Sequence, residues 1–124
     1  FEHRSYGDEL LRCQRYYYKV IADDNKRFCF GFTDNDDNRC DGLIPNPVVM
    51  RAVPTALDQT GTASNYGLRR DTSKTCSGVP TFNSATKYGI VVSFYKSGHG
   101  WGTASPVILS SAGDGAYLAW GAEL

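Results

Sequence analysis

Residues 87–96 read KYGIVVSFYK, the clearest β-strand signal in this sequence. Successive side chains on a strand point to opposite sides of the sheet, and apolar residues recur here at every second position. Both sides of the segment are largely apolar, which is typical of a strand covered on both faces. We therefore expect a central strand. Its two faces would carry Tyr88, Ile90, Val92 and Phe94 on one side and Gly89, Val91, Ser93 and Tyr95 on the other.

A second strong strand signal lies at residues 27–33, RFCFGFT. The alternation puts Phe28, Phe30 and Phe32 on one side of the predicted strand. Large aromatic rings contribute most of their stabilisation when they leave water. We therefore expect all three rings to face a hydrophobic core.

The rest of the chain predicts more strands and little helix. Ser5 and Asp8 have the spacing of a helix capping box, which predicts one short helix over residues 6–13. Asp, Asn and Gly dominate residues 34–42 and predict a polar loop. Seven to nine predicted strands indicate an all-β fold, a jelly-roll-like β-sandwich with one short N-terminal helix. The further strands are expected at residues 15–22, 48–53, 63–69, 78–82, 105–110 and 116–124.

Length and charge limit the function classes. A chain of 124 residues corresponds to one domain, here residues 1–124. Thirteen Lys and Arg balance thirteen Asp and Glu, so no net field attracts nucleic acid, and we expect none as a partner. No apolar run is long enough for a membrane-spanning helix, and we expect no membrane insertion. The chain starts at Phe1 and its one methionine is Met50, so we expect it to be the C-terminal part of a longer protein.

Metal-binding patterns in the sequence are incomplete. The four cysteines form no C-x-x-C pair, which argues against a zinc site. Asp34, Asp36 and Asn38 match the beginning of a calcium loop. The match then fails, because Arg39 replaces the turn glycine and Pro45 stands where a bidentate Glu is needed. We expect a solvated acidic loop, no metal and no other cofactor.

Catalytic patterns are weak as well. Nucleophilic catalysis needs a Ser or Cys paired with a His, and the chain has only His3, near its start, and His99, in a predicted turn. No G-x-S-x-G elbow is present. The acidic residues cluster in polar loops without apolar neighbours to perturb their pKa values. We therefore expect a protein that is not an enzyme.

Several short motifs carry a family resemblance. Residues 13–17, CQRYY, and residues 50–55, MRAVPT, together with the ending AEL at 122–124, resemble the C-terminal domain of many phage tail-fibre and related virion proteins. The opening, residues 1–10, is similar to the junction that precedes this domain. The resemblance implies a virion appendage, usually trimeric, whose distal domain contacts the host surface or a neighbouring virion protein. It transfers no binding residues, because the shared motifs are structural.

The oxidation state of the four cysteines, Cys13, Cys29, Cys40 and Cys76, depends on the cellular compartment. If the chain is a secreted module, a disulfide between Cys29 and Cys40 is the alternative. A protein assembled in bacterial cytoplasm keeps its thiols reduced, and we favour free thiols for that reason.

Three residues are candidates for contact with a host-surface glycan or protein: Tyr66, His99 and Trp101. The last two lie in a glycine-rich turn that could project a polar tip and a large ring. The alternative is that Trp101 folds back and caps the core.

Trimer contacts are expected from aromatic and small residues near the two ends of the chain. Tyrosines supply flat amphipathic surface, and small residues on the last strand let neighbouring backbones approach. The alternative is that all of them pack within one sandwich. The candidates are Tyr16, Tyr17, Tyr18, Ala119 and Gly121.

The sequence thus predicts a phage virion structural protein, the trimeric distal domain of a tail fibre that binds the host surface. A capsid or tail decoration domain is one alternative. A carbohydrate-binding module of a secreted hydrolase is another, for which oxidised cysteines would be the distinguishing observation.

Overall fold

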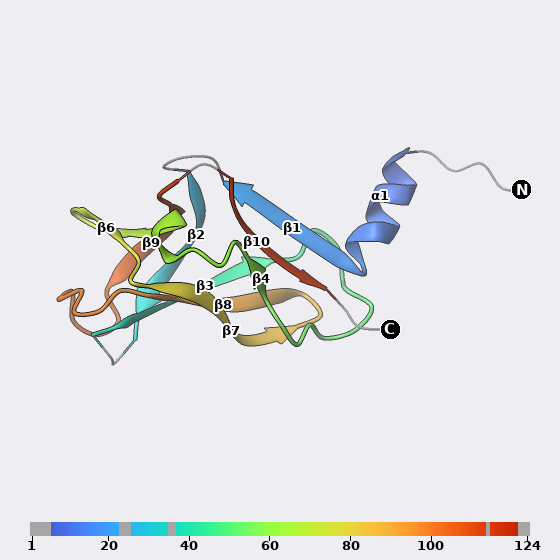
Figure 1. Ribbon diagram of the computed structural model, residues 1–124. Helices are drawn as coiled ribbons and strands as arrows, with labels where there is room; N and C mark the ends of the chain where they lie inside the picture. The colour runs from blue at the N-terminus through green and yellow to red at the C-terminus, as the bar shows by residue number, and fades with distance from the viewer. Residues whose placement is uncertain (1–5, 23–25, 35–36, 114, 122–124) are drawn as a thin grey trace, which may run out of the picture.

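The computed structural model describes residues 6–22, 26–34, 37–113 and 115–121, and it contains two antiparallel β-sheets with one α-helix at the N-terminal end (Figure 1). The prediction of an all-β sandwich with one short N-terminal helix is confirmed. The elements are α1 (Tyr6–Gln14), β1 (Tyr17–Ala22), β2 (Arg27–Thr33), β3 (Arg39–Pro45), β4 (Asp58–Gln59), the 3-10 helix η1 (Ala63–Asn65), β5 (Tyr66–Arg69), β6 (Ser73–Thr75), β7 (Gly78–Thr86), β8 (Gly89–Tyr95), β9 (Pro106–Ser111) and β10 (Ala116–Gly121).

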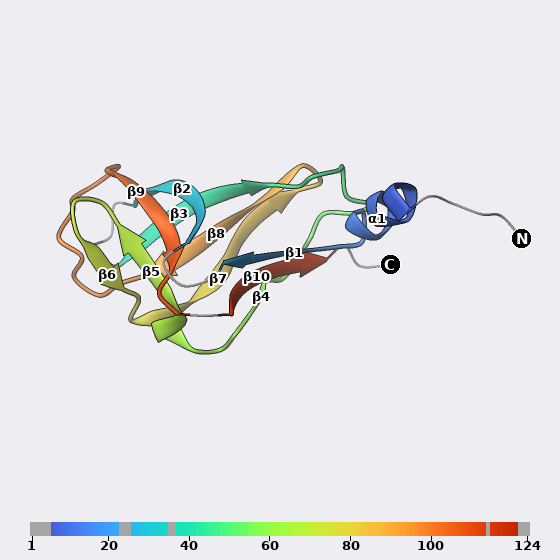
Figure 2. The ribbon, with the colours of Figure 1, turned by 90° about the horizontal axis from the view of Figure 1, so that it is seen from above.

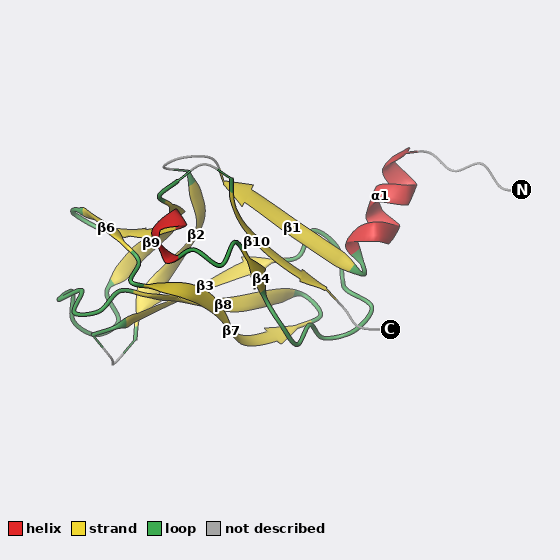
Figure 3. Cartoon of the chain, in the orientation of Figure 1, coloured by secondary structure: helices red, strands yellow, loops and turns green. Residues whose placement is uncertain are grey.

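The two sheets differ in size and shape. The smaller sheet has the order β1-β10-β4, and the larger one has the order β6-β5-β9-β2-β3-β8-β7. The larger sheet curls beneath the smaller one, and loops gather at both ends of the sandwich (Figures 1 and 3). The core lies between the sheets. Its buried side chains include Ile90, Val92 and Phe94 of β8 and Leu118 and Trp120 of β10. Tyr88, assigned by the alternation to the same face as Ile90, instead lies before β8 and is 69% exposed.

The prediction that Phe28, Phe30 and Phe32 all face the core is wrong. Phe28 packs against the core, whereas Phe30 is 74% exposed and Phe32 is 61% exposed. The register against β9 shifts between Arg27 and Cys29, so Phe28 is the extra residue of a β-bulge. Beyond the bulge the alternation is reversed, and the side chains at Cys29 and Thr33 turn inward.

A glycine pair brings β2 and β3 unusually close. Gly31 and Gly42 are directly opposite each other in the ladder. A Cβ added at Gly31 would collide with the backbone carbonyl oxygen of Asp41, and one at Gly42 would lie 2.7 Å from the Sγ atom of Cys29. Only glycine fits this approach, which accompanies the curl of the larger sheet.

Three predicted segments have other structures. Residues 63–65, the start of a predicted strand, form the 3-10 helix η1. Residues 39–45, mostly assigned to a polar loop, form β3, which pairs with both β2 and β8 and turns Cys40 and Ile44 inward. Residues 48–53, predicted to be a strand, form none. Their backbone N–H groups instead donate hydrogen bonds to two different segments, from Met50 N to Lys87 O at 2.9 Å and from Arg51 N to Arg15 O at 2.9 Å.

The helix α1 extends from one end of the sandwich, away from the sheets (Figure 2). Along its length, the side chains that can be described are exposed or half-buried, and Leu10 is among the exposed ones. No helix in the described part of the chain has the length and apolar character needed to cross a membrane.

Candidate functional site

The outer side of the larger sheet carries a group of exposed apolar side chains. Phe30 pairs across the ladder with Ile108, and Phe32 pairs with Pro106. Leu43, which follows Gly42 on the neighbouring β3, is 59% exposed. We call these five residues, Phe30, Phe32, Leu43, Pro106 and Ile108, the outer apolar face. Exposed apolar clusters of this kind are found at protein interaction surfaces and in ligand-binding grooves.

A groove runs along this face. Its volume is about 350 Å³. The exposed residue Arg69 reaches it from the end of β5, where it pairs with Ile108, and Arg70 follows directly in the next turn. Neither guanidinium forms an ion pair with any residue that the structure describes. The groove is lined by Phe30, Gly31, Phe32, Arg69, Arg70, Pro106, Val107 and Ile108.

Tyr66, a candidate for host contact, lies inside the protein with 0% exposure. It faces inward at the start of β5, and its ring stacks on Phe28 with the centroids 6.0 Å apart. It also meets Phe94 edge-on, with the centroids 5.7 Å apart. Tyr66 is therefore a core residue and cannot contact a partner from this position.

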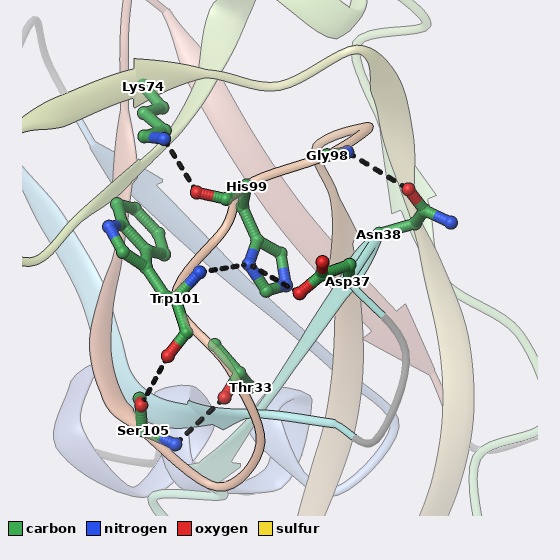
Figure 4. A network of polar contacts seen from close by, with 8 residues as sticks. All are labelled: Thr33, Asp37, Asn38, Lys74, Gly98, His99, Trp101 and Ser105. Carbon is green, nitrogen blue, oxygen red and sulfur yellow. Dashed lines mark hydrogen bonds and ion pairs between the residues drawn. The ribbon is translucent and has the colours of Figure 1, made fainter.

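His99 and Trp101 are buried as well, with exposures of 1% and 8%. Their rings stack with the centroids 5.6 Å apart, and the backbone N–H of Trp101 donates to Nδ1 of His99 at 3.1 Å (Figure 4). Positive φ angles at Gly98, Gly100 and Gly102, 63°, 73° and 77°, allow the turn to fold back. His99 and Trp101 therefore cannot contact a partner from this position, and of the two interpretations of the sequence the one in which Trp101 folds back and caps the core is confirmed.

Polar contacts hold the His99–Trp101 turn in place (Figure 4). The Nζ atom of Lys74 donates to the carbonyl oxygen of His99 at 2.6 Å and lies 5.0 Å from the centre of the Trp101 ring. The hydroxyl of Ser105 donates to the carbonyl oxygen of Trp101 at 2.6 Å. The Nε2 atom of His99 is buried and meets no hydrogen-bond partner among the described residues. These contacts give the turn a structural role.

The trimer candidates divide into two groups. Tyr16 and Tyr17 are exposed, at 43% and 49%. Tyr18 instead packs edge-on against Trp120, with the ring centroids 5.5 Å apart. Ala119 is fully buried, and its neighbours across the ladder are Lys19 of β1 on one side and Asp58 of β4 on the other. Tyr18 and Ala119 therefore pack within the chain, and the expectation that they form an intermolecular contact is corrected.

A shallow hollow lies on the outer side of the smaller sheet. It measures about 280 Å³, and its lining includes Tyr17, Ala119 and Gly121. Burial, and then the charges of Asp58 and Tyr117, raise the pKa of Tyr17 above its ordinary value. Ile21, which the sequence did not single out, is 62% exposed on the same sheet.

The cysteines are free thiols, and Cys29 and Cys40 are not bridged. Burial raises the pKa values of Cys29, Cys40 and Cys76 to about 12, with smaller increases from Asp41 at Cys40 and from Cys40 at Cys76. A thiol with so high a pKa is a poor nucleophile and metal ligand at neutral pH.

The residues considered for calcium do not form a calcium site within the described part of the chain. Asp34 forms an ion pair with Arg39, and Asp36 lies outside the described residues. Among the described residues, no group of three or more His, Cys, Asp or Glu side chains is arranged to hold a metal ion.

A scan against protein-family models and searches of the curated proteins and the solved structures return no match for this chain. The functional interpretation therefore rests on the chain's own residues. Sequence reasoning missed the outer apolar face, because the alternation from Phe28 assigned Phe30 and Phe32 to the core. Gly31 between them was the available signal, since glycine inside a strand often marks a bulge or a close backbone approach.

Proposed function

We propose that this chain is a non-catalytic binding domain of a phage virion appendage, the distal domain of a tail fibre that contacts the host surface. One observation carries the binding role: two phenylalanine rings on a central strand, Phe30 and Phe32, are 74% and 61% exposed. Burying such rings against a partner removes apolar surface from water, which favours association. The virion assignment is supported by the resemblance at residues 13–17 and 50–55.

The sandwich suits this role because the face belongs to a paired sheet. β2 is hydrogen-bonded to β9 on one side and to β3 on the other. Its exposed rings therefore stand on a support that loses little conformational entropy when a partner binds.

Assembly as a homotrimer is part of the proposal. Tyr16, Tyr17 and Ile21 remain exposed on and beside β1, away from the outer apolar face. They supply apolar surface for contacts between copies. Three copies in one trimer would raise the effective concentration of each binding face, so weak single contacts could combine into tight binding to the host surface.

Two measurements test the proposal. Light scattering should give the mass of a trimer. The labelled domain should bind cells in a panel of intact bacteria by flow cytometry, and the double variant F30S/F32S should bind at least about tenfold less. Tyr88→Ser is the matched control, because Tyr88 is 69% exposed at another position and should not matter.

A monomeric mass combined with no binding to any cell type would contradict the proposal. Binding to purified virion proteins in place of cells would indicate the decoration role. In that case the binding face would stand and the host-contact assignment would fail.

A further inference from the structure

The groove on the outer apolar face has an unusual chemical composition. Its exposed side-chain walls are carbon, from Phe30, Phe32, Pro106 and Ile108. Val107 lines the groove with its backbone, because its side chain is buried in the core. Among the described residues, the only polar side chains that line it are those of Arg69 and Arg70. Its volume of about 350 Å³ is at the small end for ligand pockets, which span roughly 300–1,000 Å³.

The two arginines give the groove a positive rim. Arg69 and Arg70 are exposed and form no ion pair with the described residues. A guanidinium presents a planar fork of donors that matches a carboxylate, and such a pair becomes stronger where apolar neighbours exclude water. The charge complement of this rim is an acidic group.

The walls favour a protein segment over a saccharide. A sugar surrounds itself with hydroxyl groups that need acceptors as well as donors, and arginine offers donors only. The side chains that line the groove in the described part of the chain include no acceptor. An apolar amino-acid side chain needs no such partner, and it would be anchored by aromatic rings in the way that interface hot spots are.

The partner must be recognised through side chains. β2 lies inside the sheet, where β9 and β3 already occupy its backbone hydrogen bonds. An incoming segment therefore cannot extend the sheet at this point. It must lie across the outer side, with an apolar residue against Phe30 and Phe32 and an acidic residue against the arginines.

We propose that this groove binds a protein segment in which an Asp or Glu lies next to a Phe, Leu or other large apolar residue. This inference rests on the proposed binding function and specifies the chemistry of the partner.

The test is a selection from a randomised peptide-display library with the purified 124-residue chain. Wild-type protein should enrich peptides that combine acidic and large apolar residues. The charge-reversed variant R69E/R70E should enrich peptides with Lys or Arg in place of the acidic residues. Arg12→Glu, on the exposed helix α1, is the matched control and should select the same peptides as the wild type.

Synthetic peptides then provide affinities. A wild-type-selected peptide should bind R69E/R70E at least about tenfold more weakly, and a version with Lys for Glu should recover part of the loss. Two-dimensional NMR should place the shifted resonances at Phe30 and Phe32. Thermal unfolding of each variant, followed by circular dichroism, checks that the exposed substitutions leave the fold intact.

Three outcomes would overturn the inference: no peptide enriched by the wild type, enrichment without acidic residues, or selection unchanged by R69E/R70E. Binding of oligogalacturonate, an acidic saccharide, in place of peptides would also overturn it. These failures are distinct from failure of the proposed function, because loss of cell binding in F30S/F32S could still be observed with any of them.

Discussion

The phenolic oxygen of Tyr66 donates a hydrogen bond of 2.6 Å to the backbone carbonyl oxygen of Tyr117. Tyr66 belongs to the larger sheet and Tyr117 to the smaller one, so this part-buried bond joins the two layers. The same oxygen accepts the backbone N–H of Thr60 at 3.0 Å. The chain between the sheets is thereby tied to both of them.

Removal of this hydroxyl should be costly although the ring remains. We expect Tyr66→Phe to lower the free energy of unfolding by about 1–3 kcal/mol, because the half-buried carbonyl of Tyr117 and the N–H of Thr60 lose their partner. Urea unfolding would measure the change. Tyr88→Phe, at a site 69% exposed, should shift stability by less than about 0.5 kcal/mol. Equal effects of the two substitutions would contradict the structural role of Tyr66.

Trp101 should behave as a core residue. Trp101→Ala would leave a cavity beneath the turn and is expected to cost about 3–5 kcal/mol, whereas Trp101→Phe should cost less. Thermal or urea unfolding tests this. If Trp101→Ala reduced cell binding while leaving stability unchanged, the ring would belong to a contact surface after all.

The three phenylalanines of β2 offer a matched series. Phe28→Ala should lower stability by about 2–4 kcal/mol, because its ring packs against Tyr66 and Phe94. Phe30→Ser and Phe32→Ser should each change it by no more than about 0.5 kcal/mol, since their rings are mostly in water. A large loss of stability in Phe30→Ser would show that the register beyond the bulge is different.

Because β2 and β3 approach closely, a side chain at Gly31 should destabilise the fold. Gly31→Ala would force a Cβ against the carbonyl oxygen of Asp41, and we expect a loss of about 1–3 kcal/mol from the strained backbone. Gly78→Ala is the control, because a Cβ there would meet its nearest neighbour at an ordinary 3.4 Å. An unchanged unfolding midpoint in Gly31→Ala would rule out the tight pairing.

The thiols should differ sharply in reactivity. In the native protein a thiol reagent such as Ellman's should modify the exposed Cys13 quickly and the other three cysteines only after unfolding. Rapid modification of all four in native buffer would contradict their burial.

Raised thiol pKa values also predict how stability depends on pH. An unfolded thiol ionises near pH 9, whereas the folded ones keep their protons until about pH 12. The unfolded state therefore binds fewer protons above pH 9, and the free energy of unfolding should fall from there toward pH 12. Below pH 9 the thiols are protonated in both states, and their full contribution to the free energy of unfolding is present. A variant with Cys76→Ala should show a shallower alkaline decline.

The local sequence pattern was sufficient to predict part of the fold. The capping-box spacing at residues 5–8 predicted a helix, and the strand patterns at residues 87–96 and 116–124 predicted two core strands, β8 and β10. These features depend on neighbours along the chain, because the period of a strand and the cap of a helix are set within a few residues. β3 escaped notice, since its Cys40-Asp41-Gly42 sequence has the composition of a turn and becomes a strand only by pairing on both sides.

The class of fold and the absence of net charge could thus be obtained from the order of the amino acids alone. The side to which Phe30 and Phe32 point, the meeting of Arg69 with Ile108, and the burial of Tyr66, His99 and Trp101 required the folded molecule. A bulge of one residue reverses every side chain that follows it, and it exists only when a partner strand sets the register. For that reason the binding face became visible in three dimensions and not in the alternation of the sequence.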